Sequence, residues 1–248
     1  MTELKTRTHR CATHGIEYPA DTRIIAGIEI QAGGCPECHA EKRRRISIVQ
    51  DAEADARRLN RSCRIEPRFT AATLENFRVA TEIQKRAFAA VTRVISGELN
   101  ALLILGPNGT GKTHLAVSAV RVMRGQIWSM YEISTRIRST YTPRATETEL
   151  EVVDQLARIP LLAIDEIGRT RGSEAEANWL SYVIDKRYSR SIPLLLISNN
   201  HQRSTCPHRG CSHCIENYLG ADIASRLADG GLTVRLDGED RRRPGSNR

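Results

Sequence analysis

The 248-residue sequence has few aromatic residues and no long hydrophobic segment. Phe, Trp and Tyr together make up 4% of the chain. No apolar run approaches the ~20 residues that a membrane-spanning helix needs, so we expect no membrane partner. The first ten residues also lack the apolar core of a signal peptide. These absences predict a cytoplasmic protein.

The charge of the chain is unbalanced, with 37 Lys and Arg residues against 29 Asp and Glu residues and a formal net charge of +8. A basic surplus rich in arginine favours a polyanionic partner, because the guanidinium group can donate two hydrogen bonds to one phosphate. A well-solvated basic surface would give the same composition. Charge alone leaves both interpretations open.

A glycine-rich segment at 106–113 has the pattern Gly-x4-Gly-Lys-Thr and lies between the apolar run 101–105 and the helix-like segment 113–120. This strand, loop and helix are typical of a P-loop, whose glycines let backbone N–H groups face phosphates. Lys112 would reach the β- and γ-phosphates, and Thr113 would offer its hydroxyl to Mg²⁺. The alternative is a chance glycine-rich turn. The predicted ATP-binding residues are Gly106, Pro107, Asn108, Gly109, Thr110, Gly111, Lys112, Thr113, His114 and Asp165.

Two carboxylates follow the apolar run at 161–164. Ligands of open α/β sheets bind at the carboxyl ends of the strands, so Asp165 is predicted to hold Mg²⁺ and Glu166 to polarise the attacking water. Asn199, after the run 194–198, is predicted to help place that water, although Asn after a strand is most often a turn residue. Together with Lys112 these residues predict a Mg-dependent ATPase.

Strand-like and helix-like segments alternate from residue 67 onward, which predicts an α/β domain with a parallel sheet flanked by helices. The expected strands are 101–105, 126–132, 161–165, 194–198 and 232–236. The expected helices are 81–96, 113–123, 147–158, 174–190 and 219–228. A Ser-, Thr- and Arg-rich connection follows the second strand.

Six of the seven cysteines fall in two clusters, which in a reducing compartment indicates metal binding more often than disulfides. The first cluster supplies two chelating pairs around a strand-like spacer and predicts a small zinc-ribbon module stabilised by its metal. Its expected ligands are Cys11, His14, Cys35 and Cys38. Reduced structural cysteines are the alternative.

The second cluster packs three cysteines and two histidines into nine residues and could complete another tetrahedral zinc site. Its expected ligands are Cys206, His208, Cys211 and Cys214. His201 could replace His208. The whole chain is predicted to comprise a zinc-ribbon module at 1–40, a basic helical linker at 41–66, an ATPase domain at 67–240 and a disordered tail at 241–248.

The motif order resembles the AAA+ ATPases of the DnaC-type helicase-loader family over about residues 67–236. The matching segments are TLENF at 73–77, GPNGTGKTHLA at 106–116, LLAIDEIG at 161–168, DKRY at 185–188, LLLISNN at 194–200 and LGADIASRL at 219–227. The resemblance implies Walker A at 106–113, Walker B at Asp165 and Glu166, sensor 1 at Asn199, and Arg226 as a finger that reaches a neighbouring subunit's ATP.

The sequence departs from the family pattern at two points. Loaders of this kind usually carry Arg where this chain has Asp222, so the finger assignment depends on Arg226 alone. The sensor-2 arginine has no single match, and Arg235, Arg241 and Arg242 are all candidates.

The resemblance implies loading of a ring-shaped replicative DNA helicase onto single-stranded DNA, with the N-terminal module binding the helicase and the subunits associating through the ATP site. The segment 134–144 would contact the DNA, although a solvated loop is an equal alternative. IstB-like transposition ATPases share the motifs but would bind duplex DNA and a transposase, and are not expected to carry a zinc ribbon. A zinc protein with a vestigial P-loop is disfavoured, because Lys112, Thr113, Asp165 and Glu166 are all present.

Overall fold

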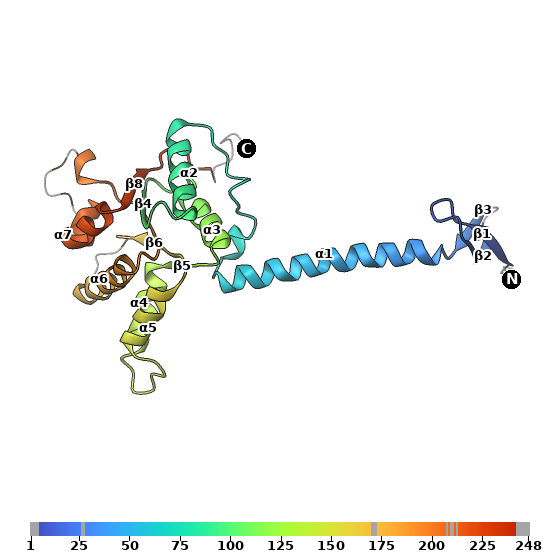
Figure 1. Cartoon of the computed structure of the whole chain (residues 1–248), viewed down its shortest axis with the longest axis horizontal. Helices are drawn as coiled ribbons and strands as arrows, with labels where there is room; N and C mark the ends of the chain where they lie inside the picture. The colour runs from blue at the N-terminus through green and yellow to red at the C-terminus, as the bar shows by residue number, and fades with distance from the viewer. Residues whose placement is uncertain are drawn as a thin grey trace. The chain divides into compact units, whose positions relative to one another are not determined.

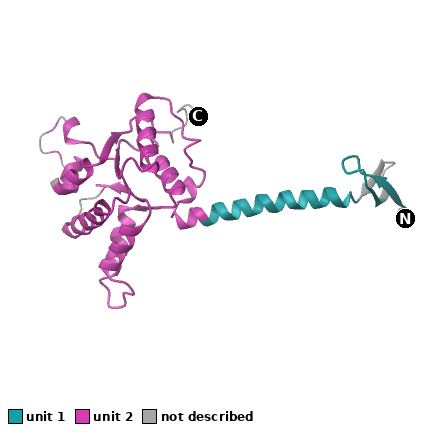
Figure 2. Cartoon of the chain, in the orientation of Figure 1, with its two compact units in different colours: residues 1–58 teal, residues 59–248 magenta. Residues whose placement is uncertain are grey.

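The structure, a computed structural model, describes residues 5–25, 28–169, 173–206, 208, 211 and 213–241. The chain divides into two compact units, Met1–Arg58 and Leu59–Arg248 (Figure 2). The division falls within the first helix. Arg242 and the rest of the tail predicted to be disordered lie outside the described residues. Within the described ranges, no helix combines the length and hydropathy that crossing a bilayer requires.

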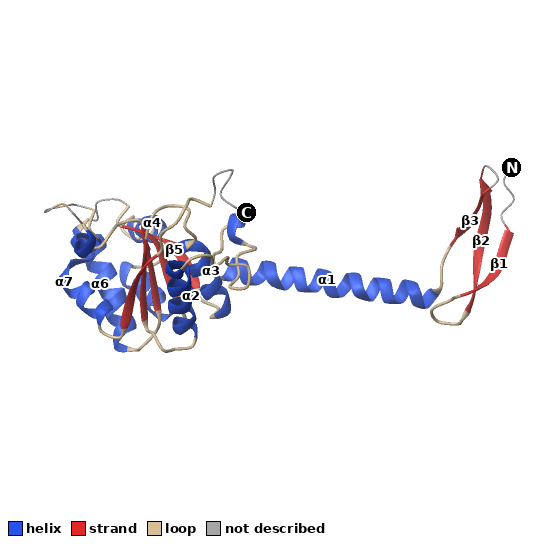
Figure 3. Cartoon of the chain, turned by 90° about the horizontal axis from the view of Figure 1, so that it is seen from above, coloured by secondary structure: helices blue, strands red, loops and turns tan. Residues whose placement is uncertain are grey.

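The first unit begins with a three-stranded antiparallel sheet in the order β1-β2-β3 (Figure 3). Its strands are β1 Lys5–Arg10, β2 Glu17–Ile25 and β3 Ile28–Ala32. Helix α1, Pro36–Ser62, follows, and none of its residues is buried. The helix therefore covers residues 41–62 of the linker predicted at 41–66, and it starts before residue 40.

The second unit is built on five parallel strands in the order β5-β6-β7-β4-β8. Figure 1 labels β4, β5, β6 and β8 among the helices of this unit. The strands are β4 Ala101–Leu105, β5 Gln126–Ser129, β6 Leu162–Ile167, β7 Leu194–Ser198 and β8 Gly231–Arg235. The predicted α/β fold with a parallel sheet is confirmed. Because β7 lies between β4 and β6, the loops after these three strands meet at one edge of the sheet.

Helices cover both faces of this sheet because successive strand residues point to opposite sides. In β4, Leu102 and Ile104 pack in the cluster with α2 and α3, whereas Leu103 and Leu105 pack in the cluster with the other four helices. Among the described residues of this unit, the helices are α2 Glu82–Ile95, α3 Lys112–Val122, α4 Met130–Ser139, α5 Glu149–Arg158, α6 Glu174–Ser189 and α7 Ile215–Ala228. Two short 3₁₀ turns, η1 Pro67–Phe69 and η2 Arg203–Thr205, complete the elements.

The prediction of a strand to residue 132, followed by an irregular connection, is wrong. Strand β5 ends at Ser129, and α4 occupies the next ten residues. The Ser129 hydroxyl accepts a hydrogen bond from the Glu132 backbone N–H, and the Glu132 carboxylate accepts one from the Ser129 N–H. This reciprocal cap starts a helix, which buries Ile133 and Ile137.

Arg187 of α6, in the DKRY segment, has a structural role. Its side chain is buried, and its guanidinium donates to the carbonyls of Leu156 (2.9 Å), Ala157 (3.3 Å) and Pro193. Burial lowers the pKa of Arg187 to about 9, which still leaves it charged at neutral pH. The cation caps the last carbonyls of α5 and ties that helix to the segment before β7.

Candidate nucleotide-binding site and metal centres

The loop between β4 and α3 requires its glycines. Gly106 has φ 145°, and a Cβ there would lie 2.1 Å from the Leu236 carbonyl oxygen. Gly111 has φ 104° and forms the N-cap of α3. The Lys112 ammonium donates to the carbonyls of Gly106 (2.7 Å) and Pro107 (2.6 Å). The loop therefore presents a helix N-terminus and a lysine together, which is an anion-binding arrangement.

Thr113 and Asp165 connect the loop to the next strand of the site. The Thr113 hydroxyl donates to Asp165 Oδ2 over 2.7 Å, and the Glu166 backbone N–H donates to Oδ1 over 2.7 Å. Burial raises the pKa of Asp165, and the two hydrogen bonds oppose this shift. A hydroxyl and a carboxylate side by side next to a phosphate-binding loop could hold Mg²⁺.

The pairing of β6 with β7 is irregular around Glu166. The register between β6 and β7 shifts between Ile164 and Ile167. Glu166, within this interval, has φ 62°, a left-handed conformation that is uncommon for a residue other than glycine. Such strain often accompanies functional sites. The Glu166 carboxylate forms an ion pair of 2.6 Å with Arg169 and raises the pKa of that guanidinium.

A cavity of about 240 Å³ brings together most of the residues predicted for the ATP site, whereas Gly106, Pro107 and Thr110 are not among its lining residues. It is lined by Asn108, Gly109, Gly111, Lys112, Thr113, His114, Asp165, Glu166 and Asn199, and also by Arg68, Phe69 and Arg241. His114 lies at this cavity, but its ring Nε2 hydrogen-bonds to the Thr73 carbonyl (2.9 Å). The expected phosphate loop, acidic pair and polar residue after β7 thus share one site.

Arg68 and Phe69 were not predicted as site residues, and Arg241 was one of three candidates for the sensor-2 arginine. Among the sensor-2 candidates, Arg241 lines the cavity, with its guanidinium 4.8 Å from the centre of the Phe77 ring. Arg235 instead pairs with Asp237 at 2.6 Å. The resemblance at residues 73–77 indicated that the segment before α2 matters, but no motif identified Arg68 or Phe69.

The sequence matches the family described as IstB-like ATP binding protein over residues 43–203, which is more than half of the chain. The chain belongs to this family. The matched segment includes the phosphate loop, both carboxylates and Asn199, and residues of all three groups line the cavity. Both sets of three cysteines lie outside the matched segment.

Curated relatives fall into two groups. The replicative helicase loader DnaC of Escherichia coli K12 is 29% identical over 153 residues, which cover 58% of this chain and 62% of the relative. The putative ATP-binding protein of insertion sequence IS21 from Pseudomonas aeruginosa is 27% identical over 143 residues, covering 57% and 52%. The chain therefore spans less than two thirds of the length of these relatives.

Solved structures confirm the fold of this IstB-like chain. A crystal structure of the DnaC helicase loader superposes with a TM-score of 0.58 at 21% identity, covering 69% of this chain and 99% of that one. The replication initiator DnaA bound to AMPPCP and single-stranded DNA gives 0.57 at 21% identity, covering 71% and 51%. These likenesses show that the second unit shares their α/β fold.

Arg226, the predicted finger, lies on α7 and is not among the described residues that line the cavity. Its Nε is 2.6 Å from Asp185 Oδ1 of α6, and both side chains are partly exposed. Helix α7 contains a break at Gly220, whose φ is 76°. Arg226 is therefore ion-paired within the chain and does not line this cavity.

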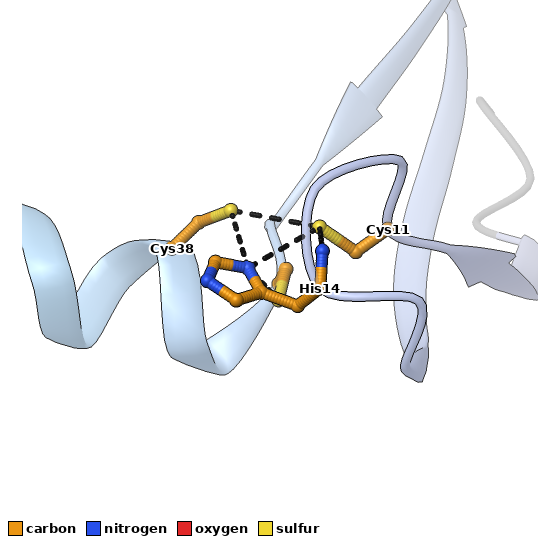
Figure 4. A group of neighbouring side chains, drawn as sticks. Cys11, His14 and Cys38 are labelled. Carbon is orange, nitrogen blue, oxygen red and sulfur yellow. Dashed lines mark hydrogen bonds between the residues drawn. The ribbon is translucent and has the colours of Figure 1, made fainter.

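The first unit of this IstB-like protein places Cys11, His14, Cys35 and Cys38 together, with all four donor atoms within 4.8 Å of one another. Figure 4 shows how Cys11, His14 and Cys38 face one another. His14 Nδ1 is 3.6, 3.7 and 3.4 Å from the sulfurs of Cys11, Cys35 and Cys38. Tetrahedral zinc with its usual bond lengths separates such donors by roughly 3.5–3.8 Å. The donor set therefore fits zinc.

The surroundings of these four residues also suit a metal. The His14 ring Nε2 lies 3.2 Å from Glu41, as is common for a metal-binding imidazole. The His14 backbone N–H and ring hydrogen-bond to Cys11 and lower the pKa of that thiol, whereas the hydrogen bond to Cys11 raises the pKa of Cys38. Cys11 and His14 lie in the turn between β1 and β2, whereas Cys35 and Cys38 lie at the start of α1 and not in a second hairpin.

In the second cluster the structure places His201, and not His208, beside Cys206, Cys211 and Cys214. These donors also lie within 4.8 Å of one another. His208 is exposed, and its carbonyl accepts a hydrogen bond from Cys206. His201 was the alternative histidine in the sequence, and its place beside the thiols comes from the pairing of its backbone with Cys214.

Proposed function

We propose that this protein is an ATP-dependent loader that binds a ring-shaped replicative helicase and delivers it to single-stranded DNA. The observation that carries this proposal is the presence, in one chain, of an ATP cavity on a DnaC-like fold and a separate unit with a zinc-type donor set. Relatives named replicative helicase loader support it.

ATP hydrolysis follows from the roles that the cavity residues would have. Lys112 would transfer its hydrogen bonds from the loop carbonyls to the phosphates, and Thr113 and Asp165 would hold Mg²⁺, whose charge stabilises the triphosphate. Glu166 would orient the attacking water and accept its proton. Asn199, which lines the same cavity, would hold that water in line with the γ-phosphate.

Self-association through the ATP site would place Arg226 of one subunit at the triphosphate of the next. A cation at that position stabilises the charge that develops on the transferred phosphoryl group. In the isolated chain Arg226 pairs with Asp185. The pair is partly exposed, so its exchange for a phosphate costs little.

Single-stranded DNA would bind at the segment 134–144, at the end of α4 and beyond it. Arg138, Tyr141 and Arg144 are exposed there and offer cations for phosphates and a ring for base stacking. Arg136 has a different role, because it is ion-paired with Glu147 at 2.6 Å and hydrogen-bonded to Gln155. We therefore assign DNA contact to the three exposed residues.

The first unit would bind the helicase, with zinc held by the three thiols and one imidazole of Cys11, His14, Cys35 and Cys38. A small three-stranded sheet buries little apolar surface, so the metal would supply most of its stability. A second function is favoured by the IS21 relative: an ATPase that helps a transposase on duplex DNA. The N-terminal unit distinguishes the two proposals.

The test is capture of the purified replicative helicase of the same host by the immobilised full-length chain. We expect capture by the wild type, loss of capture in the full-length Cys35→Ser/Cys38→Ser variant, and unchanged ATP affinity in both. His39→Ala is the matched control, because this exposed histidine lies next to Cys38 and outside the donor group. Failure of the zinc-loaded wild type to capture the helicase would contradict the proposal. Binding to a transposase on duplex DNA would then be measured.

A further inference from the structure

The connection from β7 to α7 is long and has no apolar burial to organise it. It covers residues 199–214, and its regular structure among the described residues is the short turn η2. None of the described residues between Ser198 and Cys214 is buried. Such a loop inside a compact domain needs another source of order.

Four side chains of this connection converge at one point. The donor atoms of His201, Cys206, Cys211 and Cys214 all lie within 4.8 Å of one another, and Cys211 Sγ is 3.5 Å from His201 Nε2. Tetrahedral zinc would separate a sulfur and a nitrogen donor by roughly 3.5 Å. We propose that these four residues form a second zinc site, which fixes the β7–α7 connection.

The donor set selects the class of metal and its role. Three thiolates and one imidazole suit zinc, whereas Mg²⁺ and Ca²⁺ take oxygen ligands. Four protein ligands complete a tetrahedron and leave no position for a reacting water, so the site is structural. A disulfide is the competing state of these cysteines, and it would leave the third thiol and the imidazole without a function.

A hydrogen-bonded backbone frame holds the ligands independently of the thiols. The Ile215 N–H donates to the His201 carbonyl (2.9 Å), and the His201 N–H donates to the His213 carbonyl (3.4 Å). The Asn217 side-chain amide donates to the Cys211 carbonyl (2.7 Å). Both ends of the connection are thus joined at the start of α7, where Cys214 is the N-cap residue and is buried.

The site lies between two parts of the ATP machinery. Asn199, which lines the ATP cavity, comes two residues before His201, and Cys214 opens the helix that carries Arg226. Zinc would hold the turn that carries Asn199 rigidly against the first part of α7. Its ligands are positioning residues, and their loss should lower kcat more than it changes nucleotide affinity.

The decisive measurement is the zinc content of purified full-length protein, measured by mass spectrometry after dialysis against a mild chelator. We expect the Cys206→Ser/Cys211→Ser variant to hold one zinc ion fewer than the wild type. Both cysteines are only partly buried, so the variant should fold, and ATP binding checks that it does. His208→Ala changes an exposed histidine of the same loop and should leave the content unchanged.

The Cys35→Ser/Cys38→Ser variant reports the zinc ion of the N-terminal site separately. The two sites are therefore tested independently. Replacement of zinc by cobalt should give the visible spectrum of tetrahedral thiolate coordination, and part of it should disappear in the Cys206→Ser/Cys211→Ser variant. Equal zinc content in that variant and the wild type would overturn the proposal. So would thiol titration showing that two of the three cysteines are oxidised to a disulfide in the wild type.

Discussion

Thr113 and Asp165 are 52 residues apart in the sequence, and their side chains are joined by a hydrogen bond of 2.7 Å. The bond links the first turn of α3 to the carboxyl end of β6. It places a hydroxyl and a largely buried carboxylate next to the phosphate loop. The fold therefore already brings together the hydroxyl and the carboxylate that we propose hold Mg²⁺ in the ATP site.

Thr113→Val tests this arrangement, because valine keeps the shape of the side chain and removes the hydroxyl. We expect ATP affinity in the presence of Mg²⁺ to fall by roughly 10-fold, the cost of one lost interaction with a charged group. Affinity without Mg²⁺ should change little. Titration with a fluorescent ATP analogue measures both, and Thr92→Val, at an exposed threonine of α2, is the control. Equal losses with and without Mg²⁺ would contradict the assignment.

Glu166→Gln should separate binding from hydrolysis. The amide cannot accept a proton from water, so we expect turnover to fall by about 10²–10⁴-fold while ATP still binds. Single-turnover hydrolysis measures the chemical step directly. Glu82→Gln, at an exposed glutamate of α2, should behave as the wild type. Rapid hydrolysis by the Glu166 variant would refute the role of this carboxylate.

Arg226→Ala and Lys112→Ala together test whether the finger acts between subunits. Each variant alone should lack ATPase activity, because Arg226→Ala removes the finger and Lys112→Ala removes phosphate binding. A mixture should regain part of the activity, because some interfaces then combine an intact phosphate loop with an intact Arg226 of the neighbour. Arg158→Ala, at an exposed arginine of α5, controls for loss of charge. No recovery at any ratio would show that Arg226 does not act on the neighbouring subunit's ATP.

Arg187→Met tests the buried arginine of α6. Removal of the guanidinium leaves three carbonyls without their donors, and methionine fills only part of the space. We expect the free energy of unfolding to fall by roughly 2–4 kcal/mol. Urea denaturation followed by circular dichroism measures the change, with the exposed Arg190→Met as the control. A loss below about 0.5 kcal/mol would show that the buried cation is not a stabilising contact.

Strands with short apolar runs between turn residues could be predicted from the sequence, and the predicted bounds of β4 and β7 agree with the structure. The residues of the phosphate loop, Asp165, Glu166 and Asn199 were also expected to meet, because the carboxyl ends of parallel strands share one edge. Asp165, Glu166, Asn199 and five of the eight phosphate-loop residues line one cavity.

Other features depend on contacts that a linear pattern does not show. Helix α4 was missed because apolar and aromatic residues suggested a longer strand, although the capping pair Ser129 and Glu132 was visible in the sequence. The choice of His201 over His208 depends on backbone pairing with Cys214. The place of Arg241 at the cavity depends on how the chain after β8 returns to the phosphate loop, where the Arg241 N–H donates to the Gly109 carbonyl.

Helicase loading is tested most directly on a closed circle of single-stranded DNA, coated with single-strand-binding protein and carrying one annealed oligonucleotide. A ring helicase cannot thread onto such a circle without help. With the replicative helicase of the same host, we predict that the wild type and ATP give displacement of the oligonucleotide, whereas Lys112→Ala gives none. Displacement no greater than with the helicase alone, by wild-type protein that binds both ATP and the helicase, would contradict the loader function.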